Sequence, residues 1–229
     1  MKQILYLFAL LAGIFFAWDY EALYPLKVLV VFFHESSHAL MTVFTGGKVS
    51  ELVVTRFQGG HVLSLGGSRF MVLTAGYLGS LAWGAVIYLV GAKTRLDKAA
   101  MFILGSIIIL ITVLYVRNSF ALGFNLVTGS VMILSGWLAT EKINDFLLRL
   151  VGLTSMIYVP LDIYSDTISR SHLRSDARML AEEFGGTTVM WGGLWLFISV
   201  VVIFLVLKWG MKGPESELSG DGSDSDGEK

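Results

Sequence analysis

Long apolar stretches are the feature that most limits what this chain can fold into. They lie at residues 3–18, 25–45, 70–91, 99–116, 120–140 and 187–208, and each is close to the length of about 20 residues that a helix needs to cross a bilayer. A seventh apolar stretch, 143–164, contains Arg149, Pro160 and Asp162, so it suits a membrane only where it faces protein or a water-filled cavity. We expect an all-α polytopic membrane protein with six or seven transmembrane helices.

The composition agrees with an integral, multi-pass membrane protein and narrows its partners. Charged residues make up 15% of the chain, whereas a soluble domain has about a quarter. The net charge is −1 and no basic stripe occurs, so the lipid bilayer is an expected partner and nucleic acid is not. The absence of cysteine excludes disulfides and thiolate metal ligands. Lysine and arginine divide evenly between the two sides, so they do not orient the chain.

The pattern along the chain indicates one integral membrane domain, residues 1–210, followed by a disordered acidic tail at 211–229. The stretch 3–18 fits a retained first span better than a cleaved signal peptide, because no small-residue cleavage site follows it. Alternation of apolar and polar residues with glycine pairs predicts a β-hairpin at about 46–70. A soluble helical stretch is expected at about 169–186, with Ser175 or Asp176 as its N-cap.

The second apolar stretch carries polar residues that need an explanation. Its sequence VLVVFFHESSHALMTVF, residues 28–44, contains the pattern His-Glu-x-x-His at His34, Glu35 and His38. On a helix, positions i and i+4 share one face, so both imidazoles can bind one Zn²⁺ while Glu35 addresses a bound water. His34 lies about 13 Å along a helix that starts at Pro25, near the middle of the bilayer. The motif therefore predicts a zinc site inside the membrane.

A catalytic zinc site needs a third protein ligand. His61 and His172 lie outside the apolar stretches and are expected at the wrong depth. Asp162 and Asp166 lie in YVPLDIYSDTI, four residues apart and so on one helical face. Asp162 is the more deeply embedded and is the expected third ligand, with Asp166 as the alternative. Such a site hydrolyses peptide bonds, with Glu35 as the catalytic base.

The sequence resembles the site-2 protease family of intramembrane zinc metalloproteases, in its compact branch without a PDZ domain. The stretches that carry the resemblance are HESSHAL (34–40), the glycine-rich hairpin, TAGYLGS (74–80), VPLDIYSD (159–166) and SDARMLAEEFGGTTVMWGGLWLFIS (175–199). The resemblance implies zinc ligands at His34 and His38 and a base at Glu35. The third ligand of the family is an aspartate within Leu-Asp-Gly, which Leu161 and Asp162 match except that isoleucine replaces the glycine.

The resemblance also implies that the hairpin holds a transmembrane protein substrate in extended form by strand addition. Two other functions stay open. A transporter could use the buried His, Glu and Asp groups as an ion path, and a catalytically silent relative could bind client proteins. The small residues of TAGYLGSLAWG, 74–84, favour close helix packing, with close passage by the metal site as the alternative.

Overall fold

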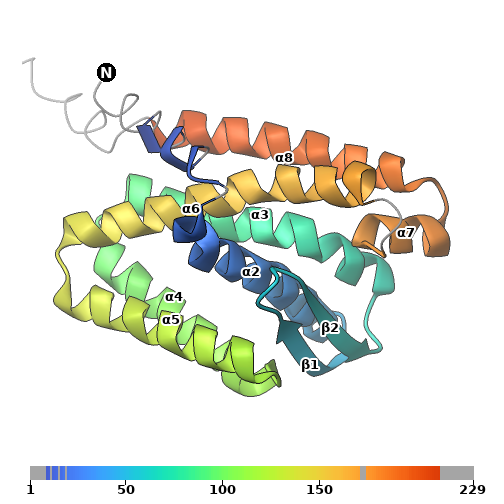
Figure 1. Cartoon of the computed structure of the whole chain (residues 1–229), viewed down its shortest axis with the longest axis horizontal. Coiled ribbons are helices and arrows are strands. Elements are labelled where there is room, and N and C mark those ends of the chain that lie inside the picture. The colour runs from blue at the N-terminus through green and yellow to red at the C-terminus, as the bar shows by residue number, and fades with distance from the viewer. Residues whose placement is uncertain (1–8, 11, 15, 19, 171–173, 212–229) are drawn as a thin grey trace, which may run out of the picture.

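The computed structural model describes residues 9–10, 12–14, 16–18, 20–170 and 174–211, and it shows a helical bundle with one β-hairpin (Figure 1). The helices are η1 (Glu21–Leu23), α2 (Tyr24–Phe44), α3 (Arg69–Lys93), α4 (Asp97–Tyr115), α5 (Ser119–Leu138), α6 (Glu141–Tyr164), η2 (Ser165–Ser169), α7 (Asp176–Phe184) and α8 (Thr188–Gly210). The strands are β1 (Lys48–Val54) and β2 (Gly60–Leu65). The predicted fold class is confirmed. The first expected span lies only partly within the described residues, and the acidic tail beyond Met211 lies outside them.

Five helices in the described part of the chain are long and apolar enough to cross a membrane: α3, α4, α5, α6 with η2, and α8. The expected seventh stretch is thus a helix of spanning length, although it contains Arg149 and Pro160. Arg149 is accommodated by an ion pair with Asp145, one turn earlier on the same helix. Helix α2 is not among the five, and we attribute this to His34, Glu35 and His38, which lower its mean hydropathy.

Helix α2 runs through the interior of the bundle. Its residues from Val28 to Ala39 are buried with the exception of His34, which is partly exposed. Pro25 lies in its first turn, where a missing N–H costs nothing. Gly46, at φ +85° in the left-handed region, follows its C-terminal end and turns the chain into β1. The His-Glu-x-x-His motif therefore lies on a helix that protein surrounds on most sides.

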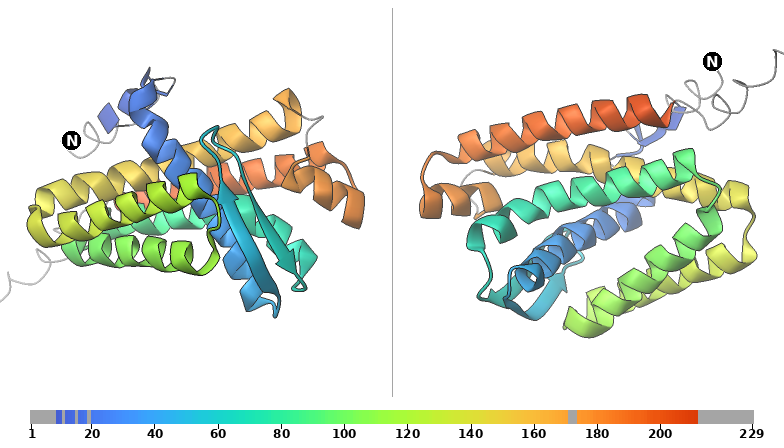
Figure 2. Two further views of the ribbon diagram at one scale, coloured as in Figure 1. Left: turned by 60° about the horizontal axis from the view of Figure 1, so that its bottom comes forward. Right: turned by 180° about the vertical axis from the view of Figure 1, so that it is seen from behind.

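Glycines set the distance between the central helices. Helix α3 lies against α2, α6 and α8 (Figure 2). A Cβ added at Gly84 would approach the carbonyl oxygen of Gly152 on α6 to 2.9 Å, so only glycine allows the two backbones this close. Helices α4 and α5 pack mainly against each other, with Gly105 and Gly129 face to face. The small residues of α3 do pack helices closely, as expected.

The predicted hairpin is confirmed and has two different edges. Strands β1 and β2 pair antiparallel, from Lys48 with Leu65 to Val54 with Gly60. The outer edge of β1 is occupied, because Leu52 forms a parallel bridge with Val116 and the Asn118 side chain donates to the Val54 carbonyl at 2.7 Å. The outer edge of β2 is paired with no strand in the described residues.

The expected soluble helix is shorter than the predicted stretch 169–186. It is α7, and the side chain of Ser175 caps it by accepting from the Arg178 N–H. Ala177 and Leu180 are fully buried on its inner face. Arg69, at the start of α3, holds the outer side through an ion pair with Glu183, and Phe70 packs edge-on against Phe184. The buried residues fix the first turns of α7 against the bundle, and the contacts of Arg69 and Phe70 hold its C-terminal end.

Candidate metal centre

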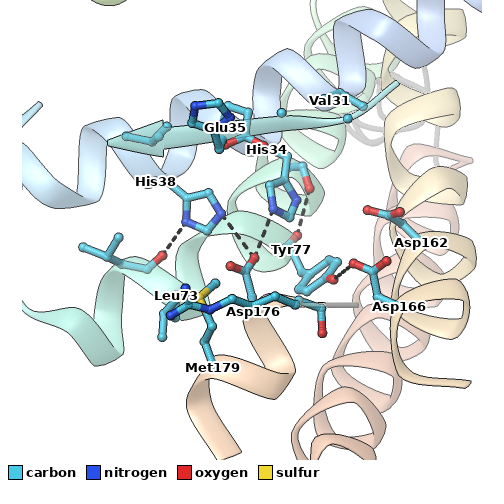
Figure 3. Close-up of a pocket in the computed structure, with 18 of the residues that line it drawn as sticks. Val31, His34, Glu35, His38, Leu73, Tyr77, Asp162, Asp166, Asp176 and Met179 are labelled. Carbon is cyan, nitrogen blue, oxygen red and sulfur yellow. Dashed lines mark hydrogen bonds and ion pairs between the residues drawn. The ribbon is translucent and has the colours of Figure 1, made fainter. Parts of the chain in front are cut away.

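The two histidines of the motif converge, as their spacing predicts. The ring centroids of His34 and His38 lie 4.8 Å apart. Both Nε2 atoms point toward a single carboxylate oxygen, Oδ2 of Asp176, at 3.1 Å from His34 and 3.2 Å from His38 (Figure 3). One ligand atom from each of these three residues lies within 4.8 Å of the others, so the group could hold a metal ion.

The structure does not bring Asp162 or Asp166 into this group. Both line the same cavity but lie outside the group. Asp166 is held at the far side of Tyr77, whose ring packs edge-on against His34, and Asp162 faces the space beside His34 (Figure 3). The Tyr77 hydroxyl donates to Asp166, and Arg170 forms an ion pair with each aspartate. The aspartate that meets the histidines comes instead from the first turn of α7.

Sequence reasoning missed Asp176 because it looked for a ligand within an apolar stretch. Asp176 lies in a polar stretch and suits a helix N-terminus, so its position in the sequence predicts only a helix cap. One signal was present: Ala177 and Leu180 form a short apolar face on the same helix. That pattern indicates that the first turn of this helix packs inward.

Asp176 is almost completely buried, at 8% exposure. Burial by itself would raise the pKa of this carboxyl, but the imidazoles of His38 and His34 outweigh it and hold the pKa of Asp176 well below its usual range. The carboxylate is therefore ionised at neutral pH. An ionised carboxylate beside two imidazoles is a donor set that suits Zn²⁺.

A hydrogen bond to the backbone orients His38. Its Nδ1 lies 2.7 Å from the carbonyl oxygen of Val72. A carbonyl can only accept, so Nδ1 carries a proton, and Nε2 is the ring nitrogen that can lose its proton and bind a metal ion. Loss of the Nε2 proton leaves the tautomer that a metal ligand at Nε2 requires.

Gly76 leaves room for the group on the side of α3. A Cβ added there would overlap the Nε2 atoms of both His34 and His38. Helix α3 thus passes directly beside the two nitrogens. The small residues of 74–84 therefore allow close passage by the candidate metal site as well as close helix packing. The residues present fit a bound metal ion, because the donors converge where only glycine leaves space.

Replacing Gly76 with alanine should remove metal binding, because the added methyl group occupies the position of the converging nitrogens. Metal content of detergent-purified protein, measured by elemental mass spectrometry, tests this. Gly123→Ala is the matched control, since a Cβ at Gly123 on α5 meets nothing within 4 Å. If Gly76→Ala retained as much metal as Gly123→Ala, the assignment of a metal site to His34, His38 and Asp176 would be contradicted.

Glu35 lies next to this group and against the hairpin. It is 5% exposed, and a Cβ at Gly60 would come within 2.6 Å of its Oε1. The first residue of β2 must therefore be small for the carboxylate to take this position. Gly60 thus lets the start of β2 lie directly against Glu35, beside the converging donors.

One cavity joins these features. It has a volume of about 570 Å³ and is lined by the metal-binding group, by Glu35, by residues 58–64 of the hairpin, by Tyr158 and by Asp162. His61 also lines it but is paired with Glu51, at 3.8 Å, away from the three donors. His172 lies outside the described residues. The cavity is large enough for a segment of extended peptide beside the unpaired edge of β2.

Comparison with known proteins supports the resemblance seen in the sequence. No curated protein and no solved structure matches the chain. A family described as Peptidase M50B-like matches residues 7–206, which is most of the chain. This agrees with a member of the site-2 protease family, and with five helices of spanning length it marks an integral, multi-pass membrane protein. The chain belongs to the Peptidase M50B-like family.

Proposed function

We propose that this protein is an intramembrane zinc metalloendopeptidase that hydrolyses peptide bonds of transmembrane substrates. The observation that carries the proposal is the convergence of His34, His38 and Asp176 beside Glu35 in one cavity. Membership of a peptidase family agrees with it. In this proposal the third ligand is Asp176, and not Asp162 or Asp166, which the sequence pattern favours.

The zinc ligands in this proposal are His34, His38 and Asp176. Three protein ligands leave a coordination position open, as catalytic zinc sites require. When bound, the ion supplies a Lewis acid that lowers the pKa of water and polarises the substrate carbonyl. The hydrogen bond from His38 to Val72 and the space at Gly76 support this ligand set.

Glu35 is the general base. It follows the ligand His34 directly, and its burial against Gly60 keeps its carboxylate within the cavity. The carboxylate takes a proton from water as the water oxygen bonds to the carbonyl carbon. It then gives that proton to the amine nitrogen as the C–N bond breaks. The products are a carboxyl terminus and a free amine.

The hairpin supports binding of the substrate in extended form. The edge of β1 is occupied by residues 116–118, whereas the edge of β2 is unpaired in the described part of the chain. Residues 60–64 of β2 line the cavity. Strand addition to β2 would hold a peptide bond beside Glu35 by main-chain hydrogen bonds. A transmembrane helix has to unwind locally to be bound in this way.

Removing the metal should abolish cleavage, and zinc should restore it. The test uses the full chain in liposomes with a set of single-span peptides, and mass spectrometry to detect new termini. Phenanthroline should eliminate new termini, and added Zn²⁺ should return them, whereas Mg²⁺ should not, because His ligands do not suit Mg²⁺. Cleavage that persists without metal would contradict the proposal. Zinc binding without cleavage of any peptide would favour a client-binding relative.

A further inference from the structure

The cavity has a second charged wall, at the C-terminal end of α6. Asp162, Asp166 and Arg170 line it, opposite β2. In Figure 3, the carboxylate of Asp162 points toward the space beside His34 and Val31, whereas that of Asp166 points to Tyr77. Once Asp176 completes the metal-binding group, the two aspartates of α6 need another role.

The two carboxylates have unequal partners. Asp166 uses both oxygens, since Oδ2 accepts from the Tyr77 hydroxyl and Oδ1 accepts from Arg170 Nη2 at 2.9 Å. The Nε of Arg170 donates to Ser165. Within the described residues Asp162 has only an ion pair to the same guanidinium, at 3.7 Å, and no hydrogen bond. Two carboxylates share one cation, so Asp162 has no cationic partner of its own among the described residues.

We propose that Asp162 is a specificity-determining residue that binds a basic side chain, lysine or arginine, of the substrate. This inference rests on the proposed function, because it takes the cavity to be where the substrate lies. The side chain of Asp162 is only 21% exposed. A partly buried carboxylate that lacks a close partner gains most from a cationic donor, since screening is weak there.

The position of the cavity fits such a substrate. Arg69 begins α3 and pairs with Glu183 of the polar helix α7, which places the start of α3 at a membrane boundary. Gly76, beside the metal-binding nitrogens, is about 10 Å further along α3. Lysine and arginine commonly flank transmembrane segments at the boundary, about 10 Å from the converging nitrogens. The substrate class is thus a spanning protein cut close to a basic residue at the boundary.

Other charges on the cavity wall do not oppose this assignment. The guanidinium of Arg69 is bound to Glu183. Arg174 is exposed to solvent at the rim, where screening weakens its effect. His61 and Glu51 face each other across the hairpin. On the α6 wall of the cavity, Asp162 is the carboxylate that lacks a hydrogen-bonded partner among the described residues, whereas Asp166 has two.

Two matched probes test the assignment. Each is a peptide hydroxamate, which binds zinc, and they differ only in carrying lysine or norleucine next to the hydroxamate. Their affinities are measured by calorimetry on the zinc-loaded full chain in detergent. The wild type should bind the lysine probe about tenfold more tightly, the effect of one charge-assisted hydrogen bond. Asp162→Asn should bring the ratio close to one and keep its zinc.

Two further variants complete the design. Glu182→Gln removes a carboxylate paired with Arg178 outside the cavity and should keep the wild-type ratio. Arg170→Gln removes the cation shared by the aspartates and should raise the preference for lysine. Equal affinities in the wild type, or loss of zinc from Asp162→Asn, would overturn the inference and leave the proposed function standing. Failure of both probes to bind the zinc-loaded protein would overturn both the inference about Asp162 and the proposed function.

Discussion

Replacing Glu35 with glutamine should leave zinc bound and reduce cleavage by a factor on the order of 10²–10⁴. Glutamine has nearly the same shape, so it fits the space that Gly60 leaves for the side chain. It cannot take a proton from water, because its amide is not basic at neutral pH. The ligands His34, His38 and Asp176 are unchanged, so metal affinity should stay near that of the wild type. Zinc content and the rate of appearance of new peptide termini are measured on the same preparation.

The same substitution at Glu182 is the control for this variant. Glu182 lies on the exposed side of α7, paired with Arg178, and its replacement should change neither zinc content nor rate. If Glu35→Gln cleaved at the wild-type rate, another group would have to act as the base. If it lost its zinc, Glu35 would have a part in holding the metal-binding group together.

The sequence is sufficient to predict helix α2, which carries His34, Glu35 and His38. Pro25 and Gly46 mark the two ends of α2, and the apolar run between them has no other glycine or proline. The helical period then places His34 and His38 on one face. Alternation and glycine pairs were likewise sufficient for the hairpin. These features depend on neighbours in sequence, and local patterns report them well.

The third member of the group depends on tertiary packing and could not be read in the same way. Asp176 reaches the histidines because Ala177 and Leu180 are buried and because Arg69 and Phe70 hold the far end of α7. These contacts join residues more than 100 positions apart. Asp162 satisfies the local rules for depth and for the Leu-Asp pair, but α6 places it outside the group of His34, His38 and Asp176, where it pairs with Arg170. Depth along one helix does not determine which side chains from different helices meet.

Replacing Asp176 with alanine should show whether Asp176 or Asp162 is the third zinc ligand. Loss of a carboxylate ligand should weaken zinc binding by more than the roughly 100-fold that loss of an outer partner can cause. Asp162→Asn and Asp166→Asn should each retain about one zinc per chain. The dissociation constant, measured by competition with a chromogenic chelator, compares the three variants directly.

The experiment also has to exclude unfolding of α7 as the cause. In excess chelator, Asp176→Ala should still unfold cooperatively, because Ala177, Leu180 and the contacts of Arg69 hold the helix. Its unfolding temperature should be somewhat lower than that of the wild type, because the ion pairs of Asp176 with His34 and His38 are lost. Added zinc should raise the unfolding temperature of the wild type and not that of the variant, since a ligand stabilises only the state that binds it. The opposite result, in which zinc stabilises Asp176→Ala and fails to stabilise Asp162→Asn, would make Asp162 on α6 the third zinc ligand.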